Sequence, residues 1–250
     1  MAPLTFPNES PAYRRARDEL ARAELDLKLQ VDRTATLRRA LPRGGALKED
    51  YVFEELDSSG RVRKVKLSDL FEHGKNSLFL YSFMYGPKMK EACPMCSSFL
   101  DGLNGNAPHI KLRMDLAVVA RSPIRRIVKF AKARGWNNLR MLSSAHNSYN
   151  TDYFGETADG AQDTMANVFV RRSDGVYHFW GTEKHYIRPG SDPCHMDTMW
   201  PLWNVLDTTP EGRGDWYPPL HVPTKRTASR KRKAKHSAGG RRTSKARRRR

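Results

Sequence analysis

The feature that most constrains the fold is an apolar run that leads into a pair of cysteines. Residues 77–85 are almost all apolar or aromatic, and the motif Cys93-Pro94-Met95-Cys96 follows closely. Such a run predicts a strand that is buried on both faces. Residues 97–103 after the motif predict the first turns of a helix. Two cysteines that are two residues apart, between a buried strand and a helix start, are typical of a dithiol redox site.

The position of the motif explains why its cysteines would be reactive. The first backbone N–H groups of a helix have no partner within the helix, and the positive end of the helix dipole stabilises a thiolate. The thiolate is the reactive form of cysteine. Pro94 suits the first helical position, where no N–H is needed. We therefore predict Cys93 and Cys96 as the catalytic residues, with Cys96 close enough to resolve a mixed disulfide formed by Cys93.

Two other interpretations of the cysteine pair stay open, an inert pair in the core and half of a zinc site. A tetrahedral zinc site needs two further ligands, and the remaining candidates are the adjacent residues Cys194 and His195. Adjacent residues chelate poorly, and the sequence has no second Cys-x2-Cys or His-x3-5-His pattern. We predict no metal site. The sequence also has no glycine-rich dinucleotide-binding or phosphate-binding motif, so we predict no cofactor.

Outside the motif, candidate residues are weaker. Cys194 could act as a third thiol whose pKa is lowered by His195, but an unreactive loop cysteine is the simpler interpretation. His146, His178 and His185 have no metal-ligand spacing. A set of aromatic residues is expected to pack in the core, with a cleft over the dithiol as the alternative for some of them: Tyr149, Tyr153, Phe154, Trp180, Trp200 and Trp203.

The charge of the chain is concentrated at its C-terminal end. The 250 residues include 45 Lys and Arg against 27 Asp and Glu, a net charge of +18. Residues 225–250 contain 14 of these basic residues and no acidic one, so the rest of the chain is nearly balanced. This segment has no Leu, Ile, Val or aromatic residue, and we expect a disordered tail. Nonspecific binding of nucleic acid through residues 225–250 is the predicted role, with an acidic membrane surface, a nuclear-localisation signal or no dedicated partner as alternatives.

The sequence also suggests a compartment. No window contains 18 apolar residues, so we predict no membrane span. The first ten residues lack the basic and apolar regions of a secretory signal. Three cysteines do not make a disulfide framework. We expect a cytoplasmic protein.

Three regions are predicted: an N-terminal helical extension (1–45), a thioredoxin-like domain (46–220) and the basic tail (221–250). Ser10-Pro11 predicts the start of an amphipathic helix that ends before Pro42. We expect its apolar face to pack on the domain or on a second copy of the chain, which would form a homodimer. The remaining elements are a hairpin around 57–60, the buried strand, the helix after the cysteines, a strand at 116–120, a helix from Ser122-Pro123 to Gly135, a short strand at 139–142, and a hairpin around 173–175. This order predicts an α/β thioredoxin-like fold, a central mixed sheet flanked by helices.

Several short pieces resemble a known family, the thioredoxin-like bacterial proteins of the domain-of-unknown-function 899 family. The matching pieces are residues 48–53, 67–71, 83–87 with 93–96, 120–123, 135–136, 200–204 and 209–214. The resemblance spans roughly residues 10–217 and implies a thioredoxin-like fold, distantly related to peroxiredoxins, with dithiol–disulfide chemistry. It implies no known substrate. The chain departs from thioredoxins in two places, because Ala92 stands where thioredoxins have Trp and no proline precedes the strand at Asn167. A peroxiredoxin motif would need Pro at Gly86 and Thr or Ser at Lys90.

Two hypotheses for function follow. The first is a thiol–disulfide oxidoreductase that uses Cys93 and Cys96 on a protein or small-molecule disulfide. The second is a non-catalytic or metal-binding thioredoxin-fold scaffold, tethered to nucleic acid by its basic tail.

Overall fold

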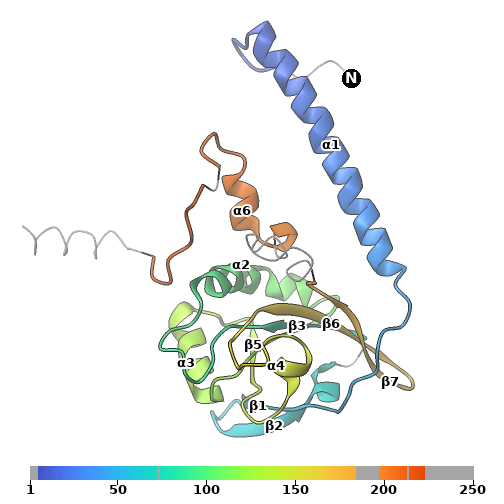
Figure 1. The fold of residues 1–250 in the computed structure, drawn as a ribbon, viewed down its shortest axis with the longest axis vertical. Coiled ribbons are helices and arrows are strands. Elements are labelled where there is room, and N and C mark those ends of the chain that lie inside the picture. Colours follow the sequence, from blue (N-terminus) through green and yellow to red (C-terminus); the bar gives the residue numbers. More distant parts are fainter. Residues whose placement is uncertain (1–4, 73, 184–196, 213, 223–250) are drawn as a thin grey trace, which may run out of the picture.

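The computed structural model describes residues 5–72, 74–183, 197–212 and 214–222 (Figure 1). Its elements, in chain order, are α1 (Pro11–Arg39), β1 (Val52–Leu56), β2 (Val62–Lys66), η1 (Leu67–Leu70), β3 (Ser77–Ser82), α2 (Pro94–Ile110), β4 (Asp115–Ala120), α3 (Ile124–Arg134), β5 (Arg140–Ser143), α4 (Tyr149–Asp152), β6 (Met165–Arg172), β7 (Gly175–Gly181), η2 (Asp197–Met199) and α6 (Pro201–Leu206).

The strands form one seven-stranded sheet in the order β2-β1-β5-β4-β3-β6-β7. The three strands β3, β4 and β5 are parallel, while β1 runs antiparallel to β5 and β6 runs antiparallel to β3. The β3–α2–β4 unit followed by the β6–β7 hairpin is the predicted thioredoxin-like arrangement, a mixed α/β sheet flanked by helices. In this register Ser82, the last residue of β3, lies opposite Met165, the first residue of β6. The start of α2 and the start of β6 therefore meet at the same end of the sheet.

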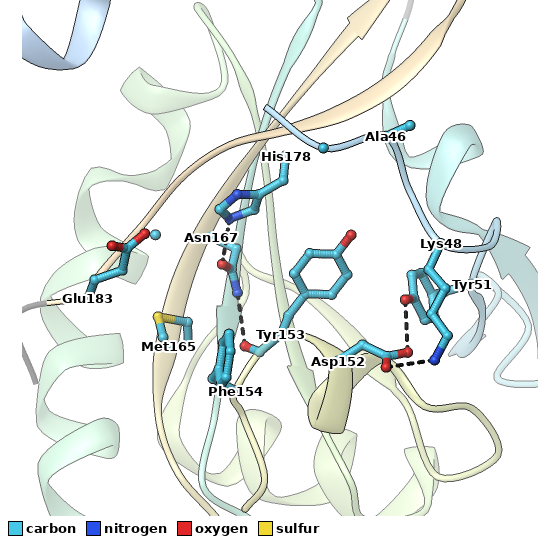
Figure 2. Close-up of a pocket in the computed structure, with 12 residues that line it drawn as sticks. Ala46, Lys48, Tyr51, Asp152, Tyr153, Phe154, Met165, Asn167, His178 and Glu183 are labelled. Carbon is cyan, nitrogen blue, oxygen red and sulfur yellow. Dashed lines mark hydrogen bonds and ion pairs between the residues drawn. The ribbon is translucent and has the colours of Figure 1, made fainter. Parts of the chain in front are cut away.

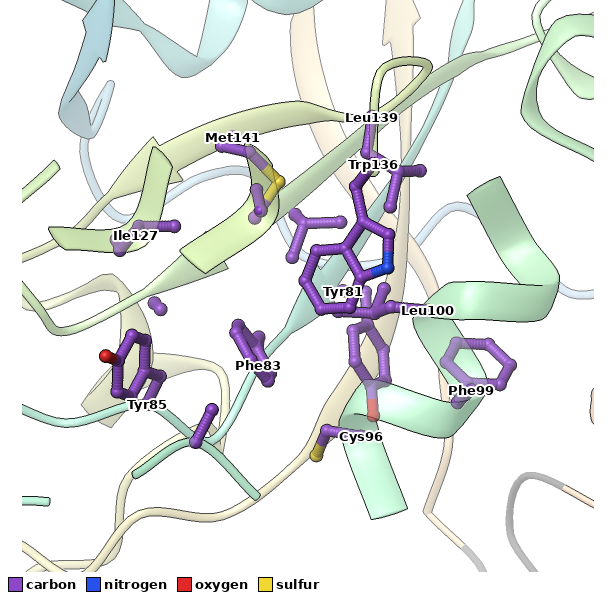
Figure 3. Close-up of a cluster of buried hydrophobic side chains, with 14 of the residues drawn as sticks. Tyr81, Phe83, Tyr85, Cys96, Phe99, Leu100, Ile127, Trp136, Leu139 and Met141 are labelled. Carbon is purple, nitrogen blue, oxygen red and sulfur yellow. The ribbon is translucent and has the colours of Figure 1, made fainter. Parts of the chain in front are cut away.

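Each face of the sheet has its own core. On one face, α2, α3 and α6 cover the strands, and the buried residues include Phe99 and Ile127 (Figure 3). Trp203 of α6 belongs to the same core. On the other face, η1, α4 and the segment before β1 cover the strands, with Tyr51 and Tyr149 buried. Every residue of β4 is buried, as expected for a central strand covered on both sides.

Local sequence signals explain where two helices begin and end. The Ser10 side chain accepts a hydrogen bond from the Tyr13 backbone N–H at 3.1 Å, and Pro11 opens α1. At the end of α3, Gly135 has a φ of 75°, in the left-handed region that favours glycine. Both boundaries agree with the sequence prediction.

Of the two expectations for the apolar face of α1, packing on the domain is wrong, and packing on a second copy of the chain stays a prediction. None of the residues of α1 is buried, and the helix extends away from the sheet in Figure 1. Near its C-terminal end, Arg38 lies over the ring of Trp180, 4.8 Å from the ring centroid. The sequence shows that α1 has an apolar face, but a periodic pattern alone does not reveal what covers that face.

Three further predictions needed correction. The strand β3 ends at Ser82, so Phe83–Tyr85 form a buried loop. The short helices α4 and α6 were not predicted as elements, because four to six residues give too few turns for a periodic signal. Phe154 does not pack in the core, since 58% of its surface is exposed. By contrast, Tyr149, Trp200 and Trp203 are buried as predicted.

Some predictions fall on parts of the chain that lie outside the described residues. These are the basic segment 225–250, Cys194, His185 and His195. Within the described ranges, no helix is both long and apolar enough to cross a membrane.

Candidate dithiol site

Cys93 occupies the capping position at the N-terminus of α2. Its backbone is extended (φ −60°, ψ 125°), and Pro94 is the first residue of the helix. The Cys93 N–H donates to the carbonyl of Met84 at 3.1 Å, which ties the cysteine to the loop that follows β3. Its own carbonyl accepts from the backbone N–H and the hydroxyl of Ser97, at 3.0 and 2.8 Å. The strand-to-helix junction predicted from the sequence is therefore the actual position of the first cysteine.

The environment of Cys93 favours its thiolate. Cys93 is half-buried, whereas only 3% of Cys96 is exposed. A hydrogen bond from the Cys96 thiol is the main reason why the pKa of Cys93 falls from 9.0 to about 6, against the opposing effect of burial. Backbone N–H groups of Cys96 and Met95 lower this pKa further. These are the unpaired donors of the first helical turn.

Cys96 has the opposite character. Its hydrogen bond to Cys93, together with burial and the adjacent negative charge, raises the pKa of Cys96. The phenol of Tyr81 on β3 forms a hydrogen bond with the Cys96 sulfur, and Tyr81 also interacts with the side chain of Thr164. Figure 3 shows Tyr81 and Cys96 side by side. The two thiols therefore differ in acidity, because the pKa of the half-buried Cys93 is lowered and the pKa of the buried Cys96 is raised.

Arg126 on α3 braces the loop between β3 and Cys93. Its guanidinium donates to the carbonyls of Gly86 (3.2 Å), Pro87 (3.3 Å), Met89 and Lys90 (3.2 Å), and to the Ser122 hydroxyl (3.2 Å). It also lies over the ring of Tyr85, 4.3 Å from the centroid. A planar cation with several donors suits this task, because one side chain can satisfy several loop carbonyls that have no strand partner.

The segment that precedes β6 approaches the same end of the sheet. The Thr164 hydroxyl donates to the carbonyl of Ser82 at 3.0 Å. The side chain of Gln162 packs against Gly86, leaving no room there for a Cβ atom. Thr164 thus stands just before β6, in a segment without proline, and none of the described peptide bonds is cis.

The other candidate residues are not brought to the dithiol. His178 on β7 lies against Asn167 on the opposite face of the sheet, with 2.9 Å between Nε2 and Oδ1. His146 is exposed, and its Nε2 lies 3.8 Å from Oε1 of Glu54. Within the described ranges, no cluster of three histidine, cysteine or acidic side chains could hold a metal ion.

The sequence pattern does not identify the three residues that support the cysteines, Tyr81, Arg126 and Thr164. Tyr81 was one aromatic residue in an apolar run, and Arg126 was one of many charges on the exposed face of a predicted helix. Neither had a local signal, because each acts across elements that are distant in the sequence. The missing proline before Asn167 did point to the unusual segment that contains Thr164.

Comparisons with known proteins identify one family and several similar structures. The family model described as "Bacterial protein of unknown function (DUF899)" matches residues 4–235. Reduced Prx3 from Vibrio vulnificus, solved in complex with hydrogen peroxide, is 15% identical with a TM-score of 0.42, and the match covers 61% of this chain and 91% of that one.

Two further solved structures are similar. Thioredoxin peroxidase I from Plasmodium yoelii is 16% identical with a TM-score of 0.42, over 73% of this chain and all of that one. The lipoprotein thioredoxin Etrx1 from Streptococcus pneumoniae is 15% identical with a TM-score of 0.37, over 59% and 97% of the two chains. No curated protein matches the sequence of this chain.

Proposed function

Since this chain belongs to the DUF899 family of bacterial proteins of unknown function, we propose that it is a thiol–disulfide oxidoreductase whose reacting groups are Cys93 and Cys96. The observation that supports the proposal is the opposite tuning of the two thiols, which lowers the pKa of Cys93 and raises that of Cys96. An attacking thiol is most effective when its pKa lies near the ambient pH. A structural pair in a core has no need of such a difference.

The proposed reaction has two exchange steps. The Cys93 thiolate attacks one sulfur of a substrate disulfide, forms a mixed disulfide and releases the other substrate sulfur as a thiolate. Cys96 then attacks the Cys93 sulfur, its proton passes to the second departing substrate thiolate, and a Cys93–Cys96 disulfide forms. The substrate gains two electrons and the dithiol loses two, so a separate dithiol reductant must restore the enzyme. The Tyr81 phenol stabilises the negative charge that Cys96 develops when it attacks.

A second candidate is a thioredoxin-fold scaffold that has lost its exchange chemistry. It is favoured by one observation, the absence of a proline from the segment that leads into β6. On this view the cysteine pair is unreactive, or binds a metal together with ligands outside the described residues.

The test uses the full chain in a Cys194→Ser background, so that two cysteines remain. The rate of alkylation by iodoacetamide is measured against pH, with the modified residue located by mass spectrometry. We expect a midpoint for Cys93 at pH about 6. In a further Cys96→Ala variant, which has no donor at this position, the midpoint should rise, because the hydrogen bond from Cys96 is the main cause of the low pKa of Cys93.

A glutathione redox series then measures the Cys93–Cys96 disulfide, with Cys93→Ser as the control that cannot form it. A midpoint near the free value of about 8.5, without a disulfide at any glutathione ratio, would reject the oxidoreductase. Stoichiometric zinc in the chain with all three cysteines, purified without chelator, would favour the scaffold.

A further inference from the structure

A second candidate site lies on the sheet face opposite α2. A cavity of about 680 Å³ opens between the segment before β1, the chain around α4, and strands β6 and β7 (Figure 2). Its volume is within the range of small-molecule sites. Its walls are mainly rings and a thioether, from Tyr51, Tyr153, Phe154, His178 and Met165. Such walls favour a flat, unsaturated ligand.

The hydrogen bonds of the cavity identify which polar groups are free. The Asn167 amide nitrogen donates to the carbonyl of Tyr153 at 3.4 Å, which turns its oxygen toward Nε2 of His178, 2.9 Å away. An amide oxygen only accepts, so Nε2 has the hydrogen and Nδ1 is an acceptor. Burial lowers the pKa of His178, in agreement with a neutral ring. Among the described residues, Nδ1 has no hydrogen-bond partner.

The charges of the cavity also favour a ligand that donates hydrogen bonds. Asp152 accepts from Lys48 at 2.8 Å and from the Tyr51 hydroxyl at 2.9 Å, so this ion pair is internally balanced. The Glu183 carboxylate lines the cavity, and no described cation pairs with it. The groups available to a ligand therefore have a net negative charge, and they are acceptors apart from the Tyr153 hydroxyl and the exposed Lys48 ammonium, which can also donate. They suit a ligand that donates hydrogen bonds and is neutral or cationic, and they oppose a phosphate or carboxylate.

The rim of the cavity contains a strained residue. Phe154 has a φ of 55°, a conformation that is unusual for a bulky side chain. Its ring lines the cavity although more than half of its surface is exposed. Backbone strain of this kind is concentrated at sites of function. An exposed phenylalanine held beside a cavity is suitable for covering one side of a bound ring.

We propose that this cavity is a binding site for a flat aromatic compound with a cationic or neutral hydrogen-bond donor group, such as an amidine or an aromatic amine. The ring would lie among the aromatic side chains, and the donor group would face His178 Nδ1 and the Glu183 carboxylate. The proposal does not depend on the dithiol, because the cavity and Cys93 are on different faces of the sheet.

Three probes with the same ring but different charge test the proposal: benzamidine, benzamide and benzoate. Binding to the full chain is followed by calorimetry and by the NMR signal of the Met165 methyl group, assigned with Met165→Leu. We expect benzamidine to bind more tightly than benzamide and to shift the Met165 signal, while benzoate binds least. Benzoate binding as tightly as benzamidine, or no shift of Met165 up to the solubility limit, would overturn the proposal.

Variants separate the two acceptors. Glu183→Gln should weaken benzamidine about threefold, as for an exposed ion pair, and leave benzamide nearly unchanged. His178→Phe keeps a ring but removes the acceptor, and should weaken both donor probes about fivefold. The matched control is Glu24→Gln on α1, which should change nothing. Equal effects of Glu183→Gln and Glu24→Gln would show that the probe binds elsewhere.

Discussion

Replacing Arg126 tests whether the dithiol depends on a brace from a neighbouring helix. Arg126→Lys keeps the positive charge but loses the planar set of donors that contacts four loop carbonyls. Several of these bonds are long and share two nitrogens, so we count them as about two effective bonds, each contributing roughly 1.5 kcal/mol from a charged donor. Weaker contact with the Tyr85 ring costs about 0.5 kcal/mol more. Lysine recovers one bond, which leaves a loss of about 2 kcal/mol.

The assay is denaturant unfolding of the full chain, together with the alkylation midpoint of Cys93. We expect the unfolding midpoint to fall at constant slope, since the folded surface is unchanged. The Cys93 midpoint should move to higher pH, because a looser loop weakens the placement of its sulfur on the helix N-terminus.

The matched control for Arg126 is its neighbour Arg125, whose guanidinium donates to the carbonyl of Gly60 at 3.2 Å. Arg125→Lys is expected to change stability by less than about 0.5 kcal/mol, as for most surface substitutions. If both lysine variants behave alike in stability and in thiol reactivity, Arg126 does not hold the loop and our reasoning about the brace is wrong.

Two further predictions concern stability. Glu55 is only 5% exposed, and its carboxylate forms ion pairs with the guanidinium groups of Arg140 (2.8 Å) and Arg63 (2.6 Å). Burial raises the pKa of Glu55, but the two arginines outweigh burial and lower this pKa overall. Its stabilisation is therefore present above the unfolded pKa of about 4.3 and is lost as pH falls through the lower folded value. Glu55→Gln should lower the free energy of unfolding by about 2 kcal/mol at pH 7. The variant should also lose less stability than the parent between pH 7 and pH 3, as measured by urea unfolding. An equal loss in the two proteins would contradict this prediction. Gly135→Ala should lower the free energy of unfolding by about 1 kcal/mol, because the φ of 75° strains any residue with a Cβ atom, although no other atom lies within 4 Å of that position. Thermal unfolding measures the change, and an alanine variant as stable as the parent would rule out this source of strain.

Local chemistry explains what could be predicted from the sequence. The cap at Ser10, the stop at Gly135 and the position of Cys93 at a helix start depend on residues within one or two turns. The parallel strands could be inferred from the length of the helical connections between their apolar runs, because a parallel pair needs a long crossover. These features make the thioredoxin-like fold and the dithiol visible in the chain itself.

Contacts between distant segments decided the rest. The carbonyls that Arg126 satisfies are 36–40 residues away, and Thr164 is more than 60 residues from Cys96. Loop closure makes such pairings a property of the whole packed sheet, and no local pattern encodes them. The same holds for the exposure of α1 and of Phe154, since hydrophobic residues seek burial but only the assembled fold determines which of them find it. The sequence by itself determined the fold and the place of the cysteine pair in it, whereas the tertiary structure alone supplied the groups that surround the pair and the cavity on the opposite face.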